Sequence, residues 1–308
     1  MKRKLVKQGA ATMMISLPSK WIKHNSLDKG DEINLEEKEN NLVITTEQTL
    51  KSKQEITIEM TKENRGNLKN ILTHIYRRGF DKITIKNIDS DILKELRDIV
   101  QILLGFEIIG KDANKCVLEN ISEPTENKYE SILKKVFVII KEDQDIILND
   151  FKTNKYVNKQ EIEESRIQGD RFVLFCRRLL IKEKNEEDAV LEWELLTSLM
   201  RVHHGFYYMY KYASENNVKV ETEVVELLGH LKDYFELFFD AYHNKNINSI
   251  HKINDLKKKY QFGKSIDHLE RSKGKNTVLH SYIKECFRNI QLATSPIYGM
   301  IFDNQIKG

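Results

Sequence analysis

The chain has 308 residues, of which 40% are hydrophobic and 31% charged, and its 50 Lys and Arg residues nearly balance 47 Asp and Glu residues. This length allows two or three domains, and the near-neutral charge excludes a uniformly polycationic protein, so any affinity for nucleic acid must come from a local patch. No secretory leader and no apolar run of membrane-spanning length is recognisable, and the three isolated cysteines, Cys116, Cys176 and Cys286, predict buried free thiols in a cytoplasmic protein without membrane insertion.

Residues 1–46 are predicted to fold as strand, strand, short helix, strand, strand. Hydrophobic residues alternate over Thr12–Leu17, as in a half-buried strand. Pro18 ends that strand and suits the first turn of a helix over Ser19–Asn25. Two further alternating runs flank Asn40–Asn41, which predicts a hairpin turn.

The beginning of this segment is basic and contains no Asp or Glu among the first 25 residues. Charge alone favours a solvated terminus, but a four-stranded unit of this size is too small to bury a core by itself. It therefore requires a partner's strands, and two copies would present a doubled basic face to the phosphates of double-stranded DNA. The candidate DNA-binding residues are Lys2, Arg3, Lys4, Lys7, Lys20 and Lys23.

Three stretches of this segment resemble the AbrB/SpoVT/MazE swapped-hairpin DNA-binding domain. The resemblance implies a homodimer of interleaved hairpins, with DNA contacts at the matching positions Arg3, Lys4, Lys7, Lys20 and Lys23. Relatives carry more glycine where this chain has Gly9-Ala10-Ala11-Thr12. The three stretches are Arg3-Lys4-Leu5-Val6-Lys7-Gln8-Gly9, Ser16-Leu17-Pro18-Ser19-Lys20-Trp21-Ile22 and Leu27-Asp28-Lys29-Gly30-Asp31-Glu32-Ile33.

Residues 54–121 are predicted to form a small βαβαβ domain that connects the two ends of the chain. No GxGxxG or Walker sequence is present, so the segment predicts no bound cofactor. The predicted elements are strand Glu55–Met60, helix Arg65–Arg78, strand Lys82–Lys86, helix Asp91–Leu104 and strand Cys116–Leu118.

Residues 126–304 are predicted to form an all-α bundle of about six helices, separated from the preceding domain by a polar segment around Pro124. The third helix has an apolar stripe at spacings of three and four residues, from Leu191 to Ala213. The aromatic cluster Phe206, Tyr207, Tyr208 and Tyr210 is expected in the core. The predicted helices are Lys128–Lys152, Lys159–Lys182, Glu186–Glu215, Thr222–His243, Asn246–Tyr260 and Lys275–Tyr298.

The order of segments resembles archaeal PhoU-related phosphate uptake regulators, in which acidic pairs on bundle helices hold metal clusters. Here Arg166 precedes Asp170 by four residues, the stretch Arg201-Val202-His203-His204 has histidine at an aspartate position, and Gln291 stands at another. These departures predict no metal site. Asp143 shares a helix face with apolar residues, so it is either buried with a partner such as a cation or a metal, or it is a surface or Arg-paired carboxylate.

The fold class expected is thus α+β and multidomain: a swapped-hairpin β domain, a βαβαβ domain and a PhoU-like helical bundle. The function expected is transcriptional regulation of phosphate homeostasis, with the bundle as a sensor. The alternatives are an adaptor that acts on phosphate-transport or signalling proteins, and an antitoxin-like protein. No catalytic constellation is recognisable, so an enzyme is not expected.

Overall fold

The computed structural model describes residues 2–9, 12–38, 41–46, 53–112, 114–122, 128–183 and 186–307, without the side chains of residues 36, 38, 183, 186–188 and 304–307. Contacts divide the chain into two units, Met1–Gln54 and Glu55–Gly308. The predicted boundary at Pro124 and part of the hairpin turn predicted at Asn40–Asn41 lie outside the described residues. No described helix combines the length and apolar character needed to cross a membrane.

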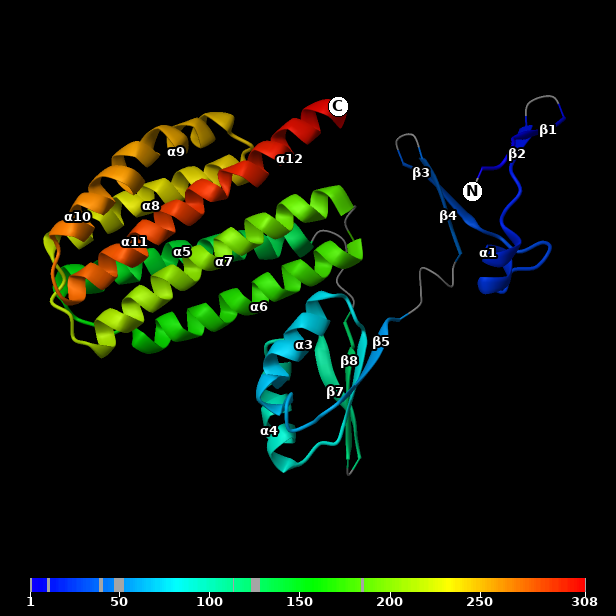
Figure 1. Ribbon diagram of the computed structural model, residues 1–308, viewed down its shortest axis with the longest axis horizontal. Coiled ribbons are helices and arrows are strands. Elements are labelled where there is room, and N and C mark those ends of the chain that lie inside the picture. Colours follow the sequence, from blue (N-terminus) through cyan, green and yellow to red (C-terminus); the bar gives the residue numbers. More distant parts are fainter. Residues whose placement is uncertain are drawn as a thin grey trace. The chain divides into compact units, whose positions relative to one another are not determined.

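The first unit contains two antiparallel hairpins with a short helix between them (Figure 1). The order of its elements agrees with the prediction, although the second strand ends at Met14 rather than at Leu17. Pro18 precedes the helix, and its carbonyl accepts a hydrogen bond from the Ile22 amide at 3.1 Å. The elements are β1 (Val6–Gln8), β2 (Thr12–Met14), α1 (Ser19–His24), β3 (Asn34–Lys38) and β4 (Asn41–Thr45).

The second unit begins with a four-stranded sheet in the order β5-β6-β8-β7 and two helices. β5 and β6 are parallel, whereas β8 is antiparallel to both β6 and β7. The elements are β5 (Glu55–Glu59), the 3-10 turn η1 (Arg65–Asn67), α3 (Leu68–Arg77), β6 (Lys82–Lys86), α4 (Ser90–Val100), β7 (Phe106–Asp112) and β8 (Lys115–Asn120).

The predicted βαβαβ order lacked strand β7 and is corrected to βαβαββ. Helix α4 ends at Val100, earlier than expected, and Gly105 then turns the chain at a φ of 86° that side chains disfavour. β7 lies at an edge of the sheet and carries a register shift between Ile108 and Gly110. An edge position and a bulge both weaken the alternation of buried and exposed residues that identifies a strand in a sequence.

The rest of the second unit is helical (Figure 1). The first four helices begin and end within one residue of the predicted positions. The elements are α5 (Lys128–Thr153), α6 (Lys159–Glu183), α7 (Glu186–Glu215), α8 (Thr222–His243), α9 (Ile247–Lys259), the π-helical turn η2 (Tyr260–Lys264), α10 (Ser265–Arg271), α11 (Lys275–Leu292) and α12 (Thr294–Lys307).

Two predictions about the later helices are wrong. Residues after Tyr260 continue through η2 into α10, and the single helix expected over Lys275–Tyr298 is divided at Ala293 into α11 and α12. The division follows from Pro296, which has no amide hydrogen for a continuous helix but fits the first turn of a new one.

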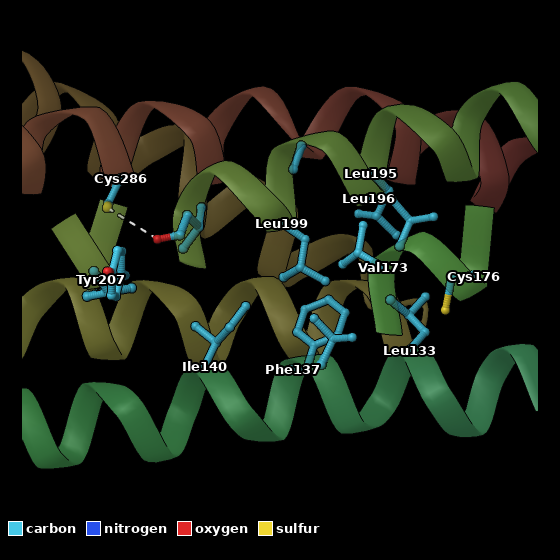
Figure 2. Packing of buried hydrophobic residues seen from close by; sticks show 14 of the residues in the cluster. Leu133, Phe137, Ile140, Val173, Cys176, Leu195, Leu196, Leu199, Tyr207 and Cys286 are labelled. Atoms are coloured by element: carbon cyan, nitrogen blue, oxygen red, sulfur yellow. Dashed lines mark hydrogen bonds between the residues drawn. The ribbon is translucent and has the colours of Figure 1, made fainter. Parts of the chain in front are cut away.

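Hydrophobic side chains of α5, α6, α7 and α11 form a continuous buried core (Figure 2). The stripe predicted on α7 is confirmed: its members from Leu195 to Ala213 are fully buried, and Leu191 at its start is partly buried. The three cysteines are free and buried, as predicted. The aromatic cluster is buried except for Tyr208, which is 46% exposed and corrects the expectation for that residue.

The sheet segment and the helices are joined within the second unit by Arg178 of α6. Its guanidinium donates hydrogen bonds to the carbonyl of Tyr76 at 3.0 Å, to the carbonyl of Phe80 at 2.6 Å and to the Asp81 carboxylate at 2.7 Å. Lys182 also contacts Asp81. Because the Arg178 and Asp81 side chains are almost fully buried, this arrangement fixes the α3–β6 turn against α6.

Candidate nucleic-acid interface

All six predicted DNA-binding residues lie in the first unit and are exposed. Three stand before β1, Lys7 lies within β1, and Lys20 and Lys23 lie on α1. Lys20 and Lys23 are three residues apart, so they share one side of the short helix. Within the described residues none of the six makes an ion pair, which leaves their charges available to phosphates.

The helix that carries Lys20 and Lys23 is fixed by local contacts. Asn25 ends it, and the Asn25 side-chain amide donates a hydrogen bond to the Trp21 carbonyl at 2.9 Å. The following turn reaches Gly30, whose φ of 102° favours glycine. In that turn the Asp28 amide donates to the Asp31 carboxylate at 2.7 Å, so this acidic group is occupied within its own loop.

The same unit exposes many large apolar side chains. In the β3–β4 hairpin Leu35 pairs with Ile44 on the face that also carries Leu42, and Leu35 and Leu42 are 60% and 59% exposed. In the first hairpin Val6 pairs with Met14 on one face. Among the described residues of this unit, the large apolar side chains that are exposed are Leu5, Val6, Met13, Met14, Ile15, Leu35 and Leu42.

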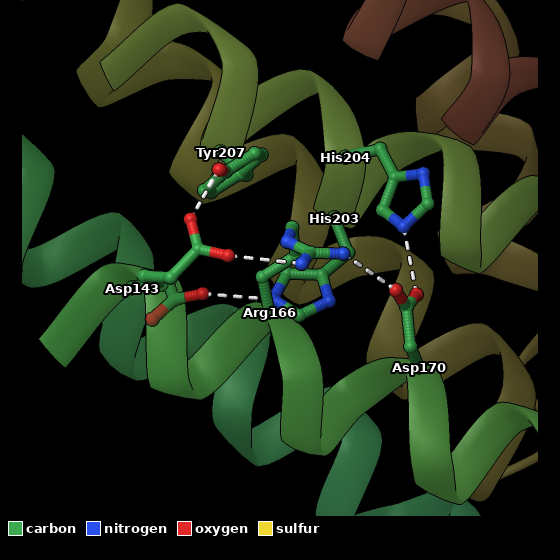
Figure 3. A network of polar contacts seen from close by, with 7 residues as sticks. Asp143, Arg166, Asp170, His203, His204 and Tyr207 are labelled. Atoms are coloured by element: carbon green, nitrogen blue, oxygen red, sulfur yellow. Dashed lines mark hydrogen bonds and ion pairs between the residues drawn. The ribbon is translucent and has the colours of Figure 1, made fainter. Parts of the chain in front are cut away.

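A separate polar cluster lies among the helices of the second unit, where histidines of α7 contact carboxylates of two other helices (Figure 3). His203 Nε2 lies 2.8 Å from Asp143 Oδ2 of α5, and both side chains are almost fully buried. Asp143 is therefore buried and paired, as one of the two predicted alternatives required, and its partner is a histidine. The expectation that it is a surface or Arg-paired carboxylate is wrong.

His204 contacts a different carboxylate, as expected for adjacent residues that point to different sides of a helix. Its Nε2 lies 2.7 Å from Asp170 Oδ1, while Arg166 Nη1 holds Asp170 Oδ2 at 2.8 Å. Burial raises the pKa of the Asp170 carboxyl, but the hydrogen bond from His204 and the charges of His204 and Arg166 outweigh it, so the pKa lies below its ordinary value. Asp170 is therefore a carboxylate whose charge is balanced by its neighbours.

Arg166 extends this cluster to a third acidic residue. Its Nη2 lies 2.9 Å from Glu163 Oε1, and the Tyr207 hydroxyl donates to the other oxygen of Glu163. Sequence reasoning identified Arg166, Asp170 and both histidines, but it missed Glu163 and the role of Tyr207. The spacing Glu163-Arg166-Asp170 along one helix face was the signal that could have found Glu163.

In the described part of the chain, no group of three or more His, Cys, Asp or Glu side chains is placed to hold a metal ion. The carboxylate of Asp143 is hydrogen-bonded to His203, and that of Asp170 to His204 and Arg166. These contacts join α5, α6 and α7. The absence of a metal in the functional protein stays a prediction.

Comparison with known proteins supports the N-terminal part of the prediction. Residues 6–59 match the family described as antidote-toxin recognition MazE, bacterial antitoxin. The resemblance to the AbrB/SpoVT/MazE type is therefore confirmed for this part of the chain, and the match does not extend to the helical region. No curated protein and no solved structure matches the chain.

Proposed function

We propose that this chain is a transcriptional regulator that binds duplex DNA as a homodimer through its first unit, while its helical region senses a signal or binds a partner. The observation that carries the proposal is a set of six exposed cations, none ion-paired with a described residue, in a unit of the MazE type. The proposal assigns no enzymatic activity and no cofactor to the chain.

Dimerisation is supported by the apolar residues that the first unit leaves exposed. Among its described residues only Thr46 is buried, so this part of the unit has no core of its own. A surface that combines so many exposed apolar residues in so few elements needs a covering partner. A second copy supplies identical hairpins, and two-fold symmetry then doubles the basic surface.

DNA contact is supported by charge. The six cations are separated along the chain from the acidic residues that follow Leu27. Each Lys or Arg that neutralises a phosphate releases a counterion, so affinity should fall steeply as salt increases. Lys20 and Lys23 on α1 and the cations around β1 are the groups we assign to phosphates.

The test is the affinity of the full chain for duplex DNA, measured by fluorescence anisotropy over a range of salt concentrations. We expect Arg3→Ala with Lys4→Ala to weaken binding at low salt and to reduce the slope of log affinity against log salt by about 1 for each phosphate that is no longer neutralised. The matched control is Lys94→Ala with Arg97→Ala, which removes the same charges from exposed positions of α4 in the second unit.

Two results would contradict the proposal. Absence of duplex affinity at low salt in the unsubstituted chain would remove the DNA-binding function. An equal loss in both double variants would show that binding follows overall charge rather than the surface assigned here.

An antitoxin-like role is the second candidate, favoured by the description of the matched family. It predicts that the chain, purified from its native host, is held in fixed stoichiometry by a toxin polypeptide. The regulator proposal instead predicts full DNA affinity in the purified chain alone.

We further propose that the regulated process is phosphate homeostasis, because the order of segments resembles that of PhoU-related regulators. Mapping of the bound sites across the host genome tests it. Sites upstream of phosphate uptake genes would support it. A chain that binds no genomic sites but associates with a phosphate transporter or sensor kinase would instead favour the adaptor alternative.

A further inference from the structure

A pocket of about 380 Å³ lies in the second unit, where α3 packs against α6 and where α7 completes the wall. Its volume falls within the range of roughly 300 to 1,000 Å³ that is typical of small-molecule sites. Four cationic side chains line it: Lys69 and Arg77 of α3, and Arg166 and Arg177 of α6. None of these residues belongs to the proposed DNA-binding surface.

Arg177 is the most unusual of these cations because it is 4% exposed and yet makes no ion pair with a described residue. Its Nη2 donates to the Thr197 hydroxyl at 2.9 Å, and its guanidinium carbon lies 5.0 Å from the centre of the Trp193 ring. Its Nε is buried and has no hydrogen-bond partner among the described residues. A buried charge without a carboxylate is costly, and a bound anion would relieve that cost.

Arg77 brings a second guanidinium to the same place. Its guanidinium carbon lies 5.9 Å from the centre of the same Trp193 ring, and it also makes no ion pair with a described residue. Burial and then the nearby charge of Arg77 lower the pKa of Arg177 to about 10, and the charge of Asp170 offsets only part of this decrease. Two like charges held beside one indole form a natural receptor for an anion, since guanidinium groups bind phosphate and carboxylate through paired hydrogen bonds.

One acidic residue lines the pocket, but it does not neutralise the positive charges of Arg77 and Arg177. It is Asp170, whose two oxygens are already held by Arg166 and His204. The positive charges of Lys69, Arg77 and Arg177 are therefore in excess over the described groups around the pocket.

Beside the charged residues, the wall has an apolar part, formed by Ile102, Ile167, Val173, Leu174 and Met200, and a polar part, formed by Asn70, Thr73, His74 and His204. This composition indicates a ligand with two parts, a charged group for the arginines and an organic body for the apolar wall. A phosphate monoester carries between one and two negative charges near neutral pH, which suits two guanidinium groups better than a single carboxylate does.

We propose that this pocket binds a small organic phosphate, with its phosphate group held by Arg77 and Arg177 and its organic body against the apolar wall of α6 and α7. The ligand would contact both α3 of the sheet segment and the helices of the bundle. The proposal does not depend on DNA binding by the first unit.

The experiment is isothermal titration calorimetry of the full chain at low salt with four probes: AMP, glucose 6-phosphate, adenosine and inorganic phosphate. We expect at least one of the two organic phosphates to bind, inorganic phosphate to bind at least tenfold more weakly, and adenosine to give no measurable binding. Failure of both organic phosphates, or equal binding of adenosine or of inorganic phosphate, would overturn the proposal.

A matched pair of variants locates the site. Arg77→Gln should weaken the binding of the organic phosphate by about 10-fold or more, as expected for loss of a charged hydrogen bond. Arg78→Gln removes the same charge from the next residue, which is exposed and does not line the pocket, and it should leave binding unchanged. Equal losses in both variants would place the anion elsewhere and contradict the assignment.

Arg177→Lys separates charge from geometry. It keeps the positive charge but loses the planar pair of donors, so we expect weaker binding in a protein that still melts cooperatively by circular dichroism. Unchanged affinity in this folded variant would show that Arg177 does not hold the phosphate. If the variant does not fold, the comparison of Arg77→Gln with Arg78→Gln decides the question.

Discussion

Gly169 of α6 has no side chain at a position where one would collide with a neighbour. A Cβ built there would overlap the ring of His203 on α7, whose Nε2 is hydrogen-bonded to Asp143. The close approach of α6 to α7 and the buried histidine–carboxylate pair therefore depend on this glycine.

We expect Gly169→Ala to lower the free energy of unfolding by about 1 to 3 kcal/mol, because overpacking outweighs the better helix propensity of alanine. The matched control is Gly229→Ala in α8, where a Cβ would meet nothing within 4 Å. That variant should gain about 0.5 to 1 kcal/mol from helix propensity. Urea unfolding measures both, and a stabilised Gly169→Ala would mean that His203 moves aside without cost.

The sequence located much of this cluster without identifying its pairs. Periodicity put Asp143 on an apolar helix face, and the altered acidic pattern singled out Asp170 and the two histidines of α7. The partner of Asp143 is 60 residues away in the chain, so it is determined by how α5 packs against α7. Arg177 was missed for the same reason. An arginine within a helix is expected to be exposed to solvent, and its burial depends on how the neighbouring helices pack around it.

At the scale of elements, Arg178 connects the turn after α3 to helix α6 through three acceptors. Arg178→Met would leave two carbonyls and the buried Asp81 without that donor. We expect a loss of about 3 to 5 kcal/mol in the free energy of unfolding, as for other broken buried pairs.

Lys182→Met provides the comparison, because Lys182 also contacts Asp81 but is partly exposed. Its loss should cost about 1 kcal/mol, since Arg178 still neutralises the carboxylate. Denaturant unfolding of both variants checks the order. Similar losses would mean that Asp81 relies on both cations equally.

Long helices with a continuous apolar stripe were predicted almost to the residue, as α7 and α8 illustrate. Short elements whose pattern depends on tertiary position were not. β7 is an edge strand interrupted by a bulge, and α10 follows a π-helical turn that contains Gly263, which in sequence suggests the end of a helix. In each of these places local propensity was overridden by contacts that periodicity does not reveal.

At the scale of the whole molecule, the proposed dimer makes a prediction about association. Leu35→Asp with Leu42→Asp places two charges on the exposed apolar face of the β3–β4 hairpin. Since that face would be buried between the two copies, we expect the full chain to become monomeric in sedimentation velocity and to lose duplex affinity in parallel.

The control uses Val157→Asp with Val190→Asp, two apolar residues of the second unit that are 76% and 66% exposed. This variant should sediment as the unsubstituted protein does. If the protein stays dimeric with the hairpin substitutions but becomes monomeric with the control substitutions, the interface lies in the second unit and not in the first.

The three buried cysteines can report local unfolding of the segments that contain them, because a buried thiol reacts with an alkylating reagent only when it becomes exposed. Desolvation raises the pKa of the thiols of Cys116 and Cys286, so in the folded state they are kept from the thiolate form that reacts with alkylating reagents. Cys116 lies in β8 and Cys286 in α11, so modification of each thiol requires the surrounding segment to open. The order in which the native residues become alkylated would therefore report, without any introduced label, whether sheet and helices unfold together or one after the other.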